Sequence, residues 1–305
     1  MNITYSIFKE PAIYTVVDHC TPKQDEDSLT VAILPRGEDP FFSPLVEELM
    51  KINPQELILF NTGFNSPACM NQVRHVWLKE DVTPGEMVNI AIREAHSKLV
   101  FVLWSNQEFS SQDVSSQVFW RIEERSDLCT IGQLYAQGGN PLPVQSMPAF
   151  DRIGFRVIRT LSEKKDLRIF SPFDYSGVYN RTRFLNLGGY DTTIENPYWQ
   201  KNDFAMRAAM WGERIVLNSA LSLHYTGQPP VDNEDFDISS RIFALKSLGI
   251  KHSKHGASLP LYRWLWVAKM PHSWALFKDI QTWVHENRFR FHYDVEQIVD
   301  NWDSL

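Results

Sequence analysis

The chain has 305 residues, of which 43% are hydrophobic and 22% charged, and its formal net charge is −7. This composition is that of a globular protein with a sizeable core, and the acidic balance argues against a nucleic acid as main partner. The three cysteines form no CxxC pair, so neither a disulfide framework nor a zinc site is expected. The N-terminus lacks a signal-peptide pattern, and no apolar run approaches the roughly 20 residues of a membrane-spanning helix. We therefore expect a cytoplasmic protein.

Apolar runs and polar connectors divide the chain into three regions. We predict an N-terminal extension over 1–28 that contains an edge strand, an α/β domain over 29–230, and a helical segment over 231–305. The last segment is rich in Trp, Phe and Tyr, with Lys and Arg among them. It either reaches a membrane surface or packs as a helical cap, because aromatic residues at helical spacing usually form core.

Strands and helices alternate in the first half of the α/β region. Strands are predicted, in chain order, at 29–35, 56–61, 75–79 and 99–103, and helices at 43–52 and 84–97. Thr83 precedes the second helix and Glu86 follows three residues later, which is the spacing of a capping box. This order of elements indicates a doubly wound mixed sheet flanked by helices.

The second half is less regular. We predict a helix over 113–126, a strand over 128–136 and a loop over 137–148. A strand, a short helix and a glycine stop follow over 173–191, then a helix over 200–212 and a strand-rich run over 213–225. From Phe236 onward the pattern predicts helices.

Polar residues follow the buried run Leu99–Leu103. In open α/β sheets the carboxyl ends of the strands hold the ligands, so Trp104, Ser105 and Asn106 are candidate binding residues. No acidic residue occurs at this end before Glu108. Neutral amide and hydroxyl oxygens bind Mg²⁺ or Mn²⁺ poorly without a carboxylate. The sequence therefore predicts no divalent metal here, unless Glu108 supplies a ligand from a shifted position.

A series of motifs carries a resemblance to a known family. In chain order these are VAILP, ELILFNTGFNS, PGEMVNIAIREA, RTRFLNLGGYD and NDFAMRAAMWG, and His224 ends the strand that follows. Their order and spacing over about Leu29 to Gly227 resemble the inverting glycosyltransferases of family 2, which have the GT-A fold. In that family the fourth motif reads R-x-x-F-x-x-x-G-G-Y-D and the fifth E-D-x-x-L-x-x-R-A-x-x-x-G.

The resemblance implies a set of site residues. Asp203 matches the catalytic base, which takes the proton of the acceptor hydroxyl, and we expect it in the first turn of its helix, where main-chain N–H groups favour its charge. The alternative is that Asp203 only caps the helix and that Arg207 pairs with an acid. The donor-binding candidates are Pro35, Asn61, Thr62, Asn89, Trp104, Ser105, Asn106 and His224. The acceptor-side candidates are Gly188, Gly189 and Asp191, although the glycine pair also fits a helix C-cap.

The chain departs from the family along the donor side. Asn61 and Thr62 replace two aspartates, and Val88 stands where relatives often have an arginine. Trp104, Ser105 and Asn106 replace the acidic metal motif. The Trp104 ring either stacks on a base or sugar or fills the place of the nucleotide.

Together these features predict a glycosyltransferase that moves a sugar with inversion from a nucleotide-sugar donor to a glycan or lipid-linked acceptor, without a metal. Peripheral contact with a membrane is expected for the lipid-linked case. The alternative is a non-catalytic GT-A-like binding or scaffold protein that has lost its donor and metal residues. A nucleotidyltransferase is disfavoured, because PRGEDP lacks the glycine- and base-rich loop that holds a triphosphate.

Overall fold

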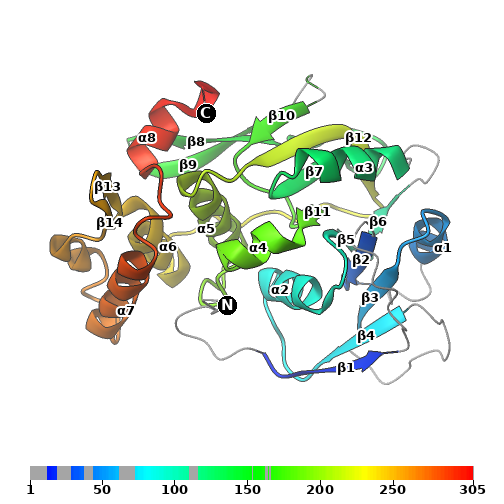
Figure 1. The fold of residues 1–305 in the computed structure, drawn as a ribbon, viewed down its shortest axis with the longest axis horizontal. Coiled ribbons are helices and arrows are strands. Elements are labelled where there is room, and N and C mark those ends of the chain that lie inside the picture. Colours follow the sequence, from blue (N-terminus) through cyan, green and yellow to red (C-terminus); the bar gives the residue numbers. More distant parts are fainter. Residues whose placement is uncertain are drawn as a thin grey trace.

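The computed structural model describes residues 12–18, 29–37, 44–61, 73–109, 116–152, 154–161, 164 and 166–304. A ten-stranded mixed sheet forms the centre of the molecule and helices flank it (Figure 1). The predicted α/β class is thus confirmed. Two short hairpins stand apart from this sheet.

The elements follow in chain order. The strands are β1 (Tyr14–Asp18), β2 (Leu29–Leu34), β3 (Glu56–Asn61), β4 (Val73–Leu78), β5 (Leu99–Trp104), β6 (Gln107–Glu108), β7 (Cys129–Tyr135), β8 (Gln145–Phe150), β9 (Phe155–Thr160), β10 (Asp166–Ile169), β11 (Gly177–Asn180), β12 (Ile215–Tyr225), β13 (Lys251–Ser253) and β14 (Gly256–Ser258). The α-helices are α1 (Pro44–Lys51), α2 (Pro84–Glu94), α3 (Ser116–Arg125), α4 (Arg181–Leu187), α5 (Pro197–Met210), α6 (Ile238–Phe243), α7 (Ser273–Glu286) and α8 (Val295–Asp300). A π-helix, η2 (Ala244–Leu248), continues α6, and two 3₁₀-helices are η3 (Leu261–Trp266) and η4 (Trp302–Ser304).

One edge of the sheet collects the carboxyl ends of most strands. The strand order is β1-β4-β3-β2-β5-β11-β7-β12-β10, and β2 runs parallel to β3 and β5. Strand β11 is antiparallel to both β5 and β7, so β7 and its parallel neighbour β12 run in the direction of β5. The carboxyl ends of β2, β3, β5, β7 and β12 therefore meet the amino end of β11. We call this the carboxyl edge.

The first half of the α/β region agrees with its sequence pattern. The four predicted strands correspond to β2, β3, β4 and β5, and the predicted helices to α1 and α2. Thr83 caps α2, because its side chain accepts a hydrogen bond from the main-chain N–H of Glu86 at 3.2 Å. The predicted edge strand is β1, which pairs with β4 at the end of the sheet.

Three expectations for the second half are wrong. The predicted loop over 137–148 ends inside β8, which forms a hairpin with β9. Pro148 obscured this strand, because proline lacks an N–H and usually argues against a strand. It is tolerated here because the strand lies at an edge. The helices after Phe236 are interrupted by the β13–β14 hairpin, which turns over Lys254 and His255 and re-enters a strand at Gly256 with φ +93°. Helix α5 begins at Pro197 and not at residue 200, since Asn196 caps it.

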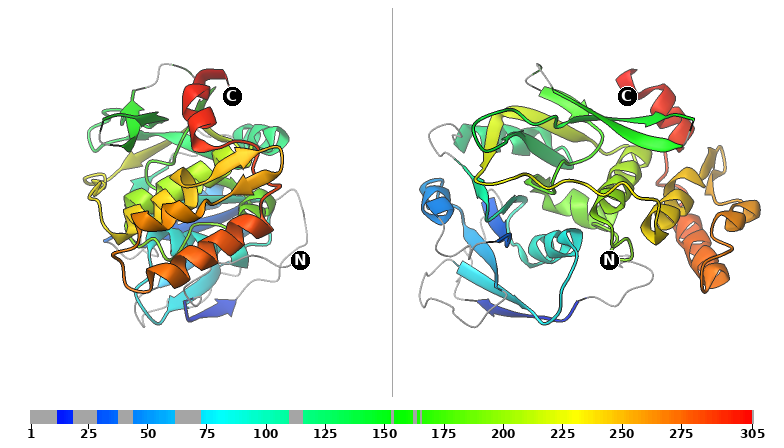
Figure 2. Two further views of the ribbon diagram at one scale, coloured as in Figure 1. Left: turned by 90° about the vertical axis from the view of Figure 1, so that its left-hand side faces the viewer. Right: turned by 180° about the vertical axis from the view of Figure 1, so that it is seen from behind.

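The C-terminal elements gather at one end of the molecule (Figure 2). Helix α7 buries one face, formed by Phe277, Ile280, Trp283 and Val284, as a packed helical cap requires. Large apolar side chains also stay exposed on η3 and the start of α7, namely Leu261, Tyr262, Leu265, Trp266 and Trp274. Peripheral membrane contact remains a prediction. Within the described ranges, no helix has both the length and the apolar character needed to cross a bilayer.

Candidate functional site

Arg36 lies at the carboxyl edge, two residues after β2, and is held from two sides. Its guanidinium lies over the Trp104 ring, with 3.6 Å between the guanidinium carbon and the ring centre. Its two terminal nitrogens donate to the Asp174 carboxylate at 2.5 and 3.0 Å. The Arg36 side chain is 26% exposed, whereas that of Asp174 is 3% exposed. The edge thus presents a fixed, partly exposed cation.

The Trp104 ring fills the interior under this arginine. Trp104 is 2% exposed, and its indole N–H donates to the main-chain carbonyl of Asp174 at 2.7 Å. Tyr225 at the end of β12 donates its hydroxyl to the Asp174 carboxylate at 2.5 Å. Burial, and then the charge of Asp174, raise the pKa of Tyr225 well above its usual range, so it remains a donor. These contacts give Trp104 a packing role, and whether it stacks on a base or sugar or takes the place of the nucleotide stays a prediction.

The Ser105 side chain and the Asn106 main chain serve the local fold, whereas Asn106 Oδ1 is buried without a hydrogen-bond partner among the described residues. The Ser105 hydroxyl accepts the main-chain N–H of Arg36 at 2.8 Å, and so ties β5 to the chain beyond β2. The main-chain carbonyl of Asn106 accepts from the N–H of Thr226 at 3.0 Å. Glu108 is exposed on β6, opposite His224 of β12. The His224 ring stacks on Tyr135 with 4.5 Å between ring centres.

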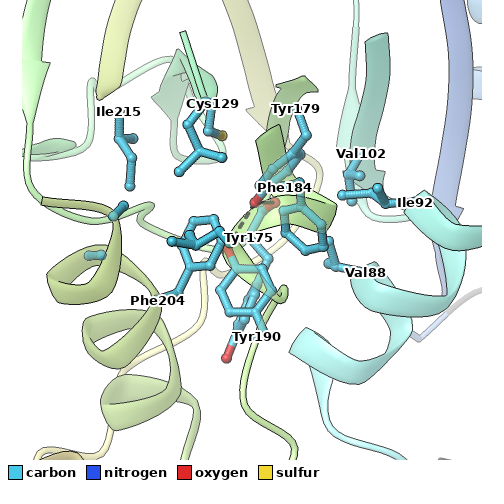
Figure 3. Close-up of a cluster of buried hydrophobic side chains, with 14 of the residues drawn as sticks. Val88, Ile92, Val102, Cys129, Tyr175, Tyr179, Phe184, Tyr190, Phe204 and Ile215 are labelled. Carbon is cyan, nitrogen blue, oxygen red and sulfur yellow. Dashed lines mark hydrogen bonds between the residues drawn. The ribbon is translucent and has the colours of Figure 1, made fainter. Parts of the chain in front are cut away.

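Tyr175 shapes the chain between these contacts and α5. Its backbone is left-handed, with φ +60°, which is uncommon for a bulky side chain. Burial raises the pKa of its hydroxyl, which donates to Gln200 Oε1 at 2.9 Å and to the Pro197 carbonyl at 3.1 Å. Figure 3 shows its ring in a cluster of buried aromatic side chains, where it lies 5.0 Å from the ring of Tyr190.

Lys201, on α5, is a second cation close to the same segment, and it is buried. Its ammonium donates to the Phe173 carbonyl at 2.5 Å and to both oxygens of Asp232 at 2.7 and 2.9 Å. The Lys201 side chain is 2% exposed. Lys201 contacts Phe173 and Arg36 contacts Asp174. Because these two residues are consecutive, the two cations lie beside the same short segment.

Asp203 lies in a buried ion network behind the site. It is fully buried, its Oδ2 accepts from Arg207 Nε at 2.8 Å, and its Oδ1 lies 3.6 Å from the Lys246 ammonium. The same ammonium pairs with Asp191. Burial alone would raise the pKa of Asp191, but Lys246 and Thr193 hold it well below its usual range. Arg207 pairs with an acid, as the alternative expectation had it.

The position of Asp203 argues for a structural role. The expectation of a first-turn residue is wrong, because α5 begins at Pro197 and Asp203 lies in its second turn. When Arg207 and Gly212 are set on the R and the final G of the fifth motif, its E-D pair falls on Gln200 and Lys201. Catalysis by Asp203 stays a prediction, and its burial and ion pairs give it no access to an acceptor hydroxyl.

The glycine pair and Asn89 join α2 to the chain after α4. Gly188 is the left-handed C-cap of α4, with φ +89°, so the C-cap alternative is confirmed. The Asn89 amide accepts from the Tyr190 N–H and donates to the Tyr190 carbonyl, both at 2.8 Å. Both ends of the Asn89 amide therefore bond the main chain of Tyr190, and donor binding by Asn89 stays a prediction.

Gly189→Ala is expected to lower the free energy of unfolding by roughly 3 kcal/mol or more. Gly189 has φ +67°, and an added Cβ would lie 2.4 Å from Asn89 Oδ1, so both left-handed strain and loss of buried hydrogen bonds contribute. Gly139→Ala is the control, since Gly139 has φ +84° with open space around it, and about 1–2 kcal/mol is expected. Urea denaturation measures both, and equal losses would contradict the role of Asn89.

The remaining donor-side candidates contribute less to the geometry. Pro35 ends β2 beside Arg36, and Asn61 ends β3 at the same edge. Thr62 lies outside the described residues. Among the described residues no group of three His, Cys, Asp or Glu could hold a metal ion, and the nearest carboxylate, Asp174, is engaged by Arg36. Binding without a divalent metal stays a prediction.

Sequence reasoning missed the charged residues that the structure brings together, namely Arg36, Arg159, Asp174, Lys201 and Asp232. Arg36 directly follows the VAILP motif, which was the one local signal available. Asp174 lies in the segment before β11, and the carbonyl of its neighbour Phe173 accepts from Lys201 of α5, so these residues meet only through the tertiary fold.

Solved structures share this fold at low sequence identity. GalNAc-T7, in a crystal structure with UDP, GalNAc and Mn²⁺, matches 92% of this chain with a TM-score of 0.61 and 14% identity. TarS of S. aureus matches 79% of this chain with a TM-score of 0.50 and 14% identity. This chain covers 58% and 42% of those two chains, so it spans about half their length. No protein-family model and no curated protein sequence matches. Both solved proteins are GT-A-fold glycosyltransferases, and the GT-A-type fold is confirmed for this chain.

Proposed function

We propose that this GT-A-fold chain is a glycosyltransferase that binds a nucleotide-sugar donor at the carboxyl edge and transfers the sugar, with inversion, to a glycan or lipid-linked acceptor. The observation that carries the proposal is the fold match, which extends over 92% of the chain at a TM-score of 0.61. The convergence of strand ends at one edge supports the position of the donor, because open α/β sheets bind ligands there.

Arg36 supplies the electrostatic part of the proposed mechanism. Sugar transfer leaves negative charge on the departing diphosphate, and fixed cations stabilise such charge without reorganising. Arg36 is partly exposed, and Asp174 and Trp104 hold it in one orientation. We assign the contact with the diphosphate to its guanidinium. The proposed mechanism relies on Arg36 without a metal, because the described residues hold no group of three His, Cys, Asp or Glu that could bind one.

A non-catalytic GT-A module is the second candidate, and one observation favours it. The inverting reaction needs a base for the acceptor hydroxyl. Lys201 stands where the family pattern has its acid, and Asp203 is enclosed by Arg207 and Lys246. A module of this kind would bind a nucleotide or a glycan and release it unchanged.

Calorimetry with UDP-, GDP- and CDP-sugars tests the donor assignment. We expect one of them to bind, with an affinity that EDTA leaves unchanged. Arg36→Ala should weaken that binding about 10- to 100-fold, because a charged hydrogen bond contributes about 1.5–3 kcal/mol. Arg156→Ala is the control, since Arg156 is exposed on β9 and pairs with Asp151. Binding that requires Mn²⁺ would contradict the assignment of Arg36, and the absence of any nucleotide binding would contradict the glycosyltransferase proposal. An assay of sugar transfer by the unsubstituted protein distinguishes the enzyme from the non-catalytic module.

A further inference from the structure

A buried lysine and a largely covered arginine share a single carboxylate beside the carboxyl edge. Lys201 on α5 holds both oxygens of Asp232 at 2.7 and 2.9 Å, and Arg159 on β9 approaches Asp232 Oδ2 at 3.9 Å. The side chains of Lys201 and Arg159 are 2% and 16% exposed. Burial lowers the pKa of both cations, and the charge of Asp232 opposes that shift. The charges of Lys201, Arg159 and Asp232 sum to +1, while Glu234 also acts on Arg159 and Asp174 on Lys201.

The guanidinium of Arg159 is only partly satisfied. Its Nη2 makes long contacts with Ser171 Oγ at 3.4 Å and the Pro172 carbonyl at 3.5 Å. Its Nη1 is buried and has no hydrogen-bond partner among the described residues. A buried guanidinium nitrogen without an acceptor is costly. Nη1 of Arg159 could therefore donate to an oxygen of an additional anion.

Asp232 reaches the cations from an irregular segment. The chain between Tyr225 and Ile238, all of it described, contains no helix or strand. It is fixed near its start, where Thr226 bonds the Asn106 carbonyl, and near its end, where Trp199 donates to the Asp235 carbonyl at 2.9 Å. Between these points Asp232 is the residue whose side chain is hydrogen-bonded to another element, namely to Lys201 of α5. Asp232 is thus a carboxylate carried on a loop into a site made by β9 and α5.

We propose that Lys201 and Arg159 form a phosphate-binding site, and that Asp232 occupies it in this structure as an internal competitor. A phosphate offers several oxygens to one ammonium and one guanidinium fork, whereas one carboxylate leaves Nη1 of Arg159 unpaired. The site adjoins Arg36 through the consecutive residues Phe173 and Asp174. The proposal holds for an enzyme and for a non-catalytic module alike, so it does not depend on sugar transfer.

Asp232→Asn tests the competition directly. Calorimetry with inorganic pyrophosphate is expected to show binding at least 10-fold tighter than in the unsubstituted protein, because the variant loses the competing charge. Asp235→Asn is the matched control, since Asp235 is an exposed acid of the same segment whose side chain contacts neither cation. Arms with UDP and with glycerol 3-phosphate distinguish a nucleotide diphosphate from a phosphate monoester as the natural source. A folded Asp232→Asn protein with unchanged pyrophosphate affinity would overturn the proposal.

Arg159→Gln keeps the test decisive if Asp232→Asn does not fold. In the unsubstituted chain, millimolar pyrophosphate should raise the melting temperature, since a ligand of the folded state stabilises it. Arg159→Gln should remove that rise while Arg156→Gln, a neighbouring exposed arginine of β9, retains it. An equal rise in both variants would refute the site, whatever the outcome of the sugar-nucleotide experiments.

Discussion

Replacing Lys246 with methionine is expected to lower the free energy of unfolding by about 3–5 kcal/mol, because the change leaves buried carboxylates without their cation. Lys246 pairs with Asp191 and lies 3.6 Å from Asp203, and the side chains of all three residues are at most 6% exposed. Methionine keeps most of the side-chain volume, so the loss reports charge more than packing. Urea denaturation followed by circular dichroism measures the change.

Lys251→Met is the matched control for this prediction. Lys251 also pairs with an acid, Glu296, at 2.6 Å, but the two side chains are 35% and 66% exposed. Exposed pairs contribute about 0–1 kcal/mol, so the control should lose little. Similar losses in the two variants would show that burial of the Lys246 network has no energetic consequence.

The same network sets a direction for the acid dependence of stability. The folded state holds the pKa of Asp191 below the ordinary value of 3.8 that applies in the unfolded chain. Such a group stabilises the protein above its unfolded pKa, and the contribution is lost as the pH falls below about 4. Lys246→Met removes the cation that lowers this pKa, so its stability should depend less on pH in that acidic range.

Asp203→Asn is expected to cost about 3 kcal/mol of stability or more while leaving turnover per folded molecule within a few-fold. The substitution removes the charge that Arg207 and Lys246 surround, and the carboxylate is fully buried in this structure. A catalytic base behaves differently, because its removal lowers turnover on the order of 10²-fold or more. Denaturation curves and initial rates corrected for the folded fraction measure the two effects.

Arg207→Met provides the comparison for Asp203→Asn. It removes the cation of the same pair, so a structural role predicts a similar loss of stability and a similarly small change in rate. A stable Asp203→Asn protein whose rate falls 10²-fold would instead establish Asp203 as the base. It would also require Arg207 and Lys246 to release the carboxylate during the reaction.

Local patterns were sufficient for the first half of the fold. The buried run of β5 and the cap of α2 are set by neighbouring residues, and the structure has both where the sequence predicts them. The β8–β9 hairpin was not visible, because Pro148 breaks its alternation and its partner lies across a turn. The strands of the β13–β14 hairpin are shorter still, and a three-residue strand carries too little periodicity to be recognised.

The candidate site was predicted in position and only in part in its residues. Trp104 and Ser105 do lie at the carboxyl edge, since strand ends fix them there. The roles of Asp203 and Lys201 depend on how the fifth motif is aligned with this helix. A shift of two positions moves the motif's acid from Asp203, which is buried and paired, to Lys201, which lies at the site. Pairs such as Arg36 with Asp174, or Lys201 with Asp232, join distant parts of the chain and have no local signature.

The left-handed backbone of Tyr175 affects how precisely the two cations, Lys201 and Arg36, are positioned at this edge. Such a conformation costs of order 1–3 kcal/mol in a residue other than glycine, and it persists only where its surroundings enforce it. Here the enforcing contacts are the hydroxyl bonds to Gln200 and Pro197, which anchor the ring to the first turn of α5. The bend directs the two residues before it to different cations, the Phe173 carbonyl to Lys201 and the Asp174 carboxylate to Arg36. A single strained torsion thereby sets the spacing of two positive charges in advance of any ligand, and glycine at this position would relieve the strain at the expense of that preset spacing.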